Sequence, residues 1–173
     1  MNAHAFTALQ SIVCQGLLSL LPKACVLAAM LLVLTQVLYP FCKCCTNYLQ
    51  VVLGFSMALG QLVGAASVGF DAFRLESSKT TIGVVCLYMS NIINTVIYDT
   101  VYAHQDLQDD LKAGILSMAV AVQGRAKPTV FALSFVEIAL LAAAGHYLDL
   151  GYEYFTLGMG GTAAYLTFML VTV

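Results

Sequence analysis

Charged side chains are scarce in this chain. Lysine, arginine, aspartate and glutamate make up 9% of its 173 residues, whereas 61% of the residues are hydrophobic. Soluble domains carry about 25% charged residues, and so few charges do not cover the surface of a globular fold in water. The sequence therefore predicts an integral membrane protein that is embedded in a lipid bilayer. Basic tracts are also missing and the formal net charge is -2, so the electrostatic footprint of a nucleic-acid-binding protein is absent.

Two further features are missing. The first residues, MNAHAFTALQ, lack the basic region of a cleavable signal peptide, so none is expected. A second cluster of ligands at zinc-binding spacing is also missing, which disfavours a zinc site at Cys42, Cys44 and Cys45. Reversible palmitoylation of these cysteines beside a hydrophobic segment is a better alternative, and ordinary free thiols are the simplest interpretation.

Long apolar runs dominate what is present. A bilayer core of about 30 Å needs about 20 apolar residues per helix. Unless a chain closes into a β-barrel, only helices satisfy its backbone hydrogen bonds inside lipid. We expect an all-α, multi-pass transmembrane helical bundle, one domain over residues 1–173, with about six helices at Ala5–Leu21, Ala24–Tyr39, Val51–Phe70, Thr80–Tyr98, Val130–Leu148 and Tyr154–Val173. Alternation places the N-terminus and residues 41–50 and 99–129 on one side, and a small excess of lysine and arginine favours the cytoplasm for it.

Two features inside these runs predict contacts between helices. Gly60 and Gly64 form a GxxxG pattern, whose small residues let helices approach closely. Glu137 lies within the fifth run, where a carboxylate is costly without a partner. We expect a hydrogen bond from Glu137 to another helix, and a contact with a substrate is the alternative.

The most informative stretch is YDTVYAHQDLQDDLK at residues 98–112. No glycine or proline interrupts it, so the fourth helix is expected to continue through it. At about 100° per residue, Asp99, Tyr102, Asp106 and Asp109 then share one stripe, and Asp110 flanks it. His104 is expected to be a solvated helix residue rather than a ligand.

Carboxylates on one face repel each other unless a cation neutralises them. Mg²⁺ accepts one or two carboxylates and completes its shell with water and substrate phosphates. The stripe therefore favours a metal-bridged diphosphate site, because ionisable residues that adjoin a membrane helix usually serve function. A solvated acidic helix end without a ligand is the alternative.

The residues YDTVYAHQDLQDDLKAG at 98–114 resemble the second aspartate-rich motif of the UbiA superfamily of membrane prenyltransferases, DxxYAxxDxxDD followed by a lysine. Tyr39-Pro40-Phe41-Cys42-Lys43 resembles that family's YPxxK element, and VVLGFSMALGQLVG at 51–64 resembles the helix after it. The YAHQD form and the Asn94-Thr95 pair are most similar to fungal members that prenylate polyketide-derived aromatics. Nothing in the sequence matches the family's first motif, NDxxDxxxD, so the chain is expected to correspond to helices three to eight of nine, truncated at both ends.

The resemblance implies a cavity in which Mg²⁺ and an isoprenyl diphosphate, such as farnesyl diphosphate, meet an aromatic acceptor. Ionisation of the diphosphate would give an allylic cation that the acceptor attacks, in terpenoid secondary metabolism at an intracellular membrane such as the endoplasmic reticulum or the mitochondrial inner membrane. By matching position, the resemblance implies three sets of residues: metal ligands Asp99, Asp106, Asp109 and Asp110; diphosphate-binding Lys43, Lys112 and Tyr102; and catalytic Asp99, Asp106 and Lys43.

Other functions remain open at this point. Cys44 stands where the family has arginine and Leu116 where it commonly has lysine, so an inactive truncated remnant or a non-catalytic membrane protein that binds lipid diphosphate is an alternative. A small transporter would place charges within several helices. In this chain they gather at the end of one predicted helix, which disfavours a transporter.

Overall fold

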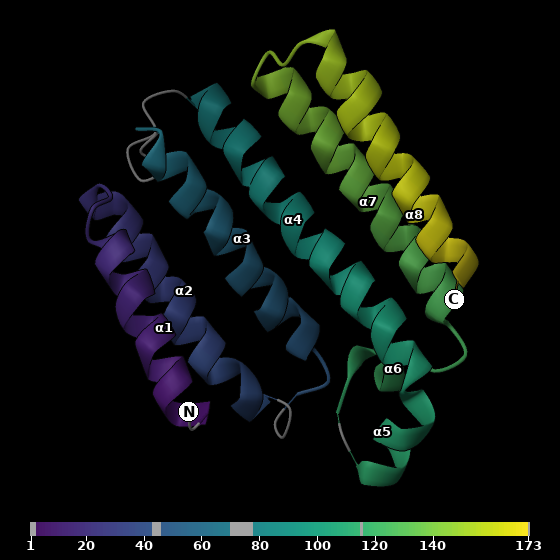
Figure 1. Ribbon diagram of the computed structural model, residues 1–173. Helices are drawn as coiled ribbons and strands as arrows, with labels where there is room; N and C mark the ends of the chain where they lie inside the picture. Colours follow the sequence, from purple (N-terminus) through teal and green to yellow (C-terminus); the bar gives the residue numbers. More distant parts are fainter. Residues whose placement is uncertain (1–2, 43–45, 70–77, 115, 173) are drawn as a thin grey trace.

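A computed structural model describes residues 3–42, 46–69, 78–114 and 116–172, and every regular element in these ranges is helical (Figure 1). In chain order the elements are α1 (Ala3–Leu18), α2 (Lys23–Cys42), α3 (Leu49–Ser67), α4 (Ser78–Gln105), α5 (Leu107–Ala113), α6 (Met118–Ala121), α7 (Ala126–Tyr147), the π-helical segment η1 (Tyr154–Met159) and α8 (Gly160–Thr172).

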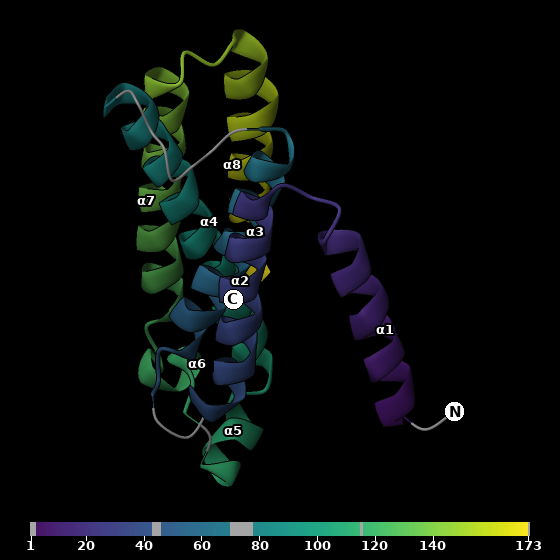
Figure 2. The ribbon, with the colours of Figure 1, turned by 90° about the vertical axis from the view of Figure 1, so that its left-hand side faces the viewer.

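Five helices of the described chain are long and apolar enough to cross a bilayer, namely α2, α3, α4, α7 and the continuous helix η1–α8. The predicted all-α, multi-pass bundle is therefore confirmed. The first predicted segment is the exception, because α1 has 16 residues and a length of about 24 Å. It stands apart from the other helices, as the side view shows (Figure 2).

The bundle is a row of helices in the order α2, α3, α4, α7 and α8, with α4 in the middle (Figure 1). Two small cores hold the row together. On one flank of α4, Ile97 and Val101 pack with Val130 of α7 and with Leu166 and Met169 of α8. On the other flank, Ala58 of α3 packs with Ile92 and Val96. Apolar burial thus fixes α4 between its neighbours, and α4 carries the acidic stretch at its end.

Successive long helices run in opposite directions through the bundle, as predicted (Figure 1). The end of α2 and the short helices α5 and α6 lie at one end, and the α7–η1 connection lies at the other (Figure 1). The acidic stretch and the Tyr39-Pro40 pair near the end of α2 therefore lie at the same end of the bundle.

The close helix approach in α3 occurs at a different glycine from the predicted GxxxG pair. A Cβ atom at Gly54 would lie 2.8 Å from the backbone oxygen of Ile92 in α4, whereas one at Gly60 or Gly64 would meet nothing within 4 Å. The prediction for Gly60 and Gly64 is therefore wrong within the described chain, because both are exposed on α3 while Gly54 is buried.

The expected partner of Glu137 is Asn94. Glu137 in α7 is 2% exposed, and the Nδ2 of Asn94 in α4 donates a hydrogen bond of 2.9 Å to its Oε1. The other carboxylate oxygen, Oε2, is buried without a hydrogen-bond partner among the described residues. The expectation of a hydrogen bond across helices is confirmed, and the bond lies inside the α4–α7 contact.

Candidate functional site

A polar pocket of about 240 Å³ lies where α4 ends. Side chains from α2, the start of α3, the end of α4, α5 and the residue before α6 line it. We call it the aspartate pocket, and its lining residues are Tyr39, Leu49, Gln50, Asp99, Tyr102, Ala103, Gln105, Asp106, Asp110 and Ser117. Residues as far apart in the sequence as Tyr39 and Ser117 thus contribute to one site.

The acidic stretch is not one uninterrupted helix, so that prediction is wrong. Helix α4 ends at Gln105, and Asp106 is the N-cap of α5 with φ -97° and ψ 8°. The backbone oxygen of Asp106 accepts hydrogen bonds from the N–H groups of Asp109 (3.0 Å) and Asp110 (2.9 Å). The break places these two acids in the first turn of a new helix, where the helix dipole stabilises negative charge, rather than in the last turn of α4, where it opposes it.

The break also changes which aspartates share a surface. Asp99, Tyr102, Asp106 and Asp110 line the pocket, and Asp109 does not. Instead, the Nζ of Lys112 donates to the Oδ1 of Asp109 at 3.2 Å, and both side chains are largely exposed. Of the pocket's described lining residues none carries a positive charge, so three carboxylates face it without a lysine or arginine among them.

Asp110 accepts a hydrogen bond from Ser117, and the residue after Ser117 is hydrogen-bonded to Gln50 of α3. The Oγ of Ser117 donates to the Oδ2 of Asp110 at 3.3 Å and accepts from the backbone N–H of Val120 at 3.3 Å. The side-chain oxygen of Gln50 accepts from the backbone N–H of Met118 at 3.2 Å. Gln50 and Ser117 are 1% and 3% exposed, so each of these bonds has at least one buried partner.

Sequence reasoning did not identify several of the lining residues as parts of the site. Tyr39 was recognised only as the start of the YPxxK element, and Gln50 was not singled out as a site residue. Ser117 and Gln105 carried no signal of their own. A polar residue at the start of a membrane helix, such as Gln50, is a clue that could have found one of them.

The structure does not bring every residue that the sequence singled out into the pocket. Lys43, the predicted catalytic and diphosphate-binding lysine, lies outside the described residues, as do Cys44 and Cys45. His104 does not line the pocket. It is partly buried and its Nδ1 atom has no hydrogen-bond partner within the described structure, so the expectation of a solvated residue is wrong.

The donors in the pocket fit Mg²⁺. Carboxylate, hydroxyl and amide oxygens are hard ligands, and Mg²⁺ usually keeps several waters and binds through one or two carboxylates plus substrate phosphates. Among the described residues, no three histidine, cysteine, aspartate or glutamate side chains form a group that holds a metal ion by itself. The pocket therefore suits an ion that arrives with further oxygen ligands, as a magnesium diphosphate would provide.

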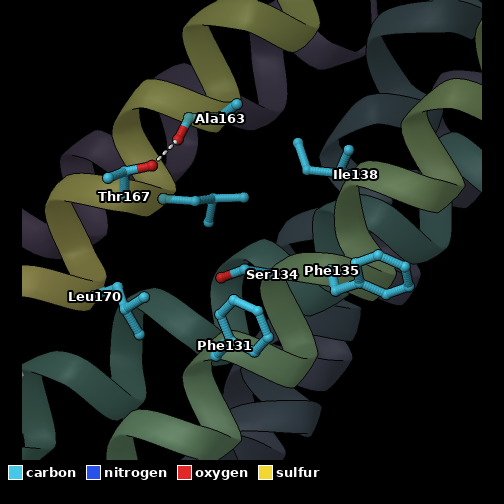
Figure 3. A pocket seen from close by; sticks show the side chains of 8 residues that line it. Phe131, Ser134, Phe135, Ile138, Ala163, Thr167 and Leu170 are labelled. Carbon is cyan, nitrogen blue, oxygen red and sulfur yellow. Dashed lines mark hydrogen bonds between the residues drawn. The ribbon is translucent and has the colours of Figure 1, made fainter.

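A second pocket, of about 220 Å³, lies between α7 and α8 (Figure 3). Phe131, Ser134 and Phe135 line it from α7, and Thr167 and Leu170 line it from α8. Thr167 donates its hydroxyl to the backbone oxygen of Ala163 at 2.8 Å. No titratable side chain lines this pocket among the described residues, so it offers space for hydrocarbon rather than groups for chemistry.

Comparison with known proteins shows which family the chain resembles. The family model described as "UbiA prenyltransferase family" matches residues 1–173. Prenyltransferase stbC of Stachybotrys bisbyi is 31% identical over 88% of this chain and 45% of its own length. The mitochondrial 4-hydroxybenzoate polyprenyltransferase of Schizosaccharomyces pombe is 40% identical over 79% of the chain and 37% of its own length. Its counterpart in Saccharomyces cerevisiae is 38% identical over 98% of the chain and 44% of its own length.

The chain spans less than half the length of these relatives. No solved structure matches it significantly.

Proposed function

The chain belongs to the UbiA prenyltransferase family, and from this premise we propose that it serves the transfer of an isoprenyl group from its diphosphate to an aromatic acceptor. One observation carries the proposal. Asp99, Asp106 and Asp110 line one pocket at the end of a membrane helix. Carboxylates gathered around one pocket repel each other, so a site of this kind gains most from a divalent cation.

Four lining residues and their charged neighbours in the sequence have a part in the proposed site. Asp99, Asp106 and Asp110 bind Mg²⁺, with Asp109 less directly involved because it faces away and pairs with Lys112. Tyr102 contacts the diphosphate or the first isoprenyl unit, and Lys43 and Lys112 contribute positive charge to the phosphate oxygens. The ion, when bound, stabilises the negative charge that develops on the departing diphosphate.

The chemistry balances without a redox partner. The bond between the isoprenyl C1 and the diphosphate oxygen breaks, and both electrons leave with the diphosphate. A ring carbon of the acceptor forms the new bond to C1 and then loses its proton, which restores aromaticity. The membrane setting of the site suits an isoprenyl chain, because a chain that leaves the aspartate pocket along α4 enters the apolar part of the bilayer.

The relatives suggest finer features of the substrates. We propose a farnesyl-like isoprenyl group and a phenolic acceptor of polyketide origin, in terpenoid secondary metabolism. Relatives named after 4-hydroxybenzoate support an alternative phenolic acid as acceptor, since the two classes share the ring that is attacked. An intracellular membrane, of the endoplasmic reticulum or of mitochondria, is the proposed location.

Membranes that contain the chain test this function directly. They are incubated with Mg²⁺, farnesyl diphosphate and either 4-hydroxybenzoate or a resorcinol-type phenol, and prenylated products are measured by mass spectrometry. We expect product that depends on Mg²⁺ and disappears when Mg²⁺ is chelated. Membranes with the Asp106→Ala variant are the control.

Two results separate the alternatives. Absence of product above the Asp106→Ala control, together with Mg²⁺-dependent binding of farnesyl diphosphate, would support a non-catalytic diphosphate-binding protein. Absence of both product and binding would contradict the proposed function for this chain and favour an inactive remnant.

A further inference from the structure

Short helix α5 needs an external support if Asp110 is to face the pocket. It has seven residues, and isolated helices shorter than about 12 residues are marginal in water. It begins directly after the break at Asp106 and ends at Ala113, and its C-cap Gly114 adopts the left-handed conformation with φ 67°. Its own backbone therefore does little to fix the direction of the Asp110 side chain.

Ser117 supplies one link of the support. A serine hydroxyl has one proton to donate and two lone pairs. The N–H of Val120 occupies a lone pair, because Ser117 is the N-cap of α6. The hydroxyl proton is thus directed away from α6, and it meets the Oδ2 of Asp110.

Gln50 supplies the second link, from a different part of the bundle. Its side-chain oxygen accepts the N–H of Met118, one of the donors that the start of a helix leaves without a partner. Gln50 belongs to the first turn of α3, which packs against α2 and α4. The N-terminus of α6, and with it Ser117, is therefore anchored to a membrane helix.

We propose that Gln50 and Ser117 act together as positioning residues, which hold the carboxylate of Asp110 in the aspartate pocket in the orientation that binds magnesium diphosphate. The inference rests on the proposed function for its binding step. Both residues are nearly fully buried and line the same pocket as Asp99 and Asp106. Groups behind a metal ligand commonly change metal affinity because they orient the ligand.

Binding measurements on the purified full chain in detergent test whether Gln50 and Ser117 affect ligand binding. The probe is farnesyl thiodiphosphate, a slowly reacting analogue, titrated with Mg²⁺. Ser117→Ala and Gln50→Met should each raise the Mg²⁺ concentration for half-maximal binding by roughly tenfold or more. Ser117→Thr, which keeps the hydroxyl, should restore most of the affinity. The matched controls are Ser90→Ala, a buried serine that donates within α4, and Gln61→Met on the exposed face of α3.

A double-mutant comparison separates positioning from general stability. If Ser117 acts through Asp110, then Ser117→Ala should have no further effect in an Asp110→Asn background, because the group that it orients has changed. Equal effects of Ser117→Ala in both backgrounds would overturn the inference. So would wild-type affinity of both Ser117→Ala and Gln50→Met.

Hydrogen–deuterium exchange tests the support without any ligand. Backbone amides of residues 107–113 should exchange faster in Ser117→Ala and in Gln50→Met than in the unmodified chain and in the Ser90→Ala control. Unchanged exchange in both variants would contradict the proposed support. Absence of Mg²⁺-dependent probe binding by the unmodified chain would instead contradict the proposed function, so the two failures are distinguishable.

Discussion

Neighbouring aspartates in the acidic stretch have different surroundings. The charge of Asp109 is balanced at the surface by Lys112. The carboxylate of Asp110 points into the pocket and accepts a hydrogen bond from Ser117. Adjacent residues on a short helix thus face opposite environments, since successive side chains are rotated by about 100°. The structure thus distinguishes two neighbouring aspartates that the motif leaves together.

Substitution of these two aspartates gives the first prediction. Asp110→Asn should lower Mg²⁺-dependent prenyl transfer by roughly 100-fold, because a charged ligand at the departing diphosphate is lost. Asp109→Asn should lower it by less than about tenfold, because an exposed ion pair contributes little. Rates from membranes with matched protein content measure both effects. A larger loss for Asp109→Asn than for Asp110→Asn would contradict this assignment.

The buried pair of Asn94 and Glu137 gives the second prediction. Asn94→Ala should lower the free energy of unfolding by about 1–2 kcal/mol, because hydrogen bonds between membrane helices contribute on this order. A double-mutant cycle with Glu137→Ala should give a positive coupling free energy, measured by unfolding in mixed micelles with a denaturing detergent. Asn91→Ala, also on α4, is the control. A coupling near zero would show that the bond does not stabilise the α4–α7 contact.

At the scale of the elements, the contact between α3 and α4 depends on backbone proximity. Gly54 is buried against the backbone of Ile92, and α4 is also held on its other flank by Ile97 and Val101. Because α3 carries Gln50 and α4 carries Asp99, the distance between these helices also sets the width of the aspartate pocket.

The glycines of α3 give the third prediction. Gly54→Ala should destabilise the protein by about 1–3 kcal/mol, because the added methyl group overlaps a backbone oxygen that cannot rotate away. Gly60→Ala, on the same helix, meets open space and should change stability by no more than about 0.5 kcal/mol. Thermal unfolding in detergent, followed by circular dichroism, compares the two variants. Equal destabilisation by both would contradict the assigned contact.

At the scale of the whole molecule, the helices form a row rather than a closed ring (Figure 1). Large apolar side chains are exposed along it, among them Leu34 and Val37 of α2 and Phe135 of α7. Exposed apolar surface on this scale is unfavourable in water and favourable in hydrocarbon. The lipid bilayer is therefore the environment that stabilises the row. The aspartate pocket lies at one end of the bundle, where α4 ends.

The two opposite ends of the bundle give the fourth prediction. Single cysteines at Gln108 and Arg125, introduced into a chain without its native cysteines, should react with a membrane-impermeant maleimide from one side of sealed vesicles. A cysteine at Gly151 should react only from the other side, because the α7–η1 connection lies at the opposite end (Figure 1). Labelling of all three from the same side would contradict this topology.

Much of the fold could be predicted because its cause is local. Apolar runs of about 20 residues form helices in lipid whatever their neighbours are, and α2, α3, α4, α7 and η1–α8 follow the predicted segments. The sequence predicted that Glu137 forms a hydrogen bond to another helix, but not that Asn94 is its partner. Its identity depends on which residue of α4 faces α7, and that is decided by the packing of two helices.

The sequence by itself determined the class of protein, the family and the acidic stretch, because hydrophobicity and a spaced motif are properties of consecutive residues. Only the tertiary structure decided that the stretch breaks at Asp106, that Asp110 faces the pocket while Asp109 pairs with Lys112, and that Gln50 and Ser117 lie behind Asp110. The last of these features depends on a hydrogen bond between residues 50 and 118, and no local pattern encodes a hydrogen bond across that separation.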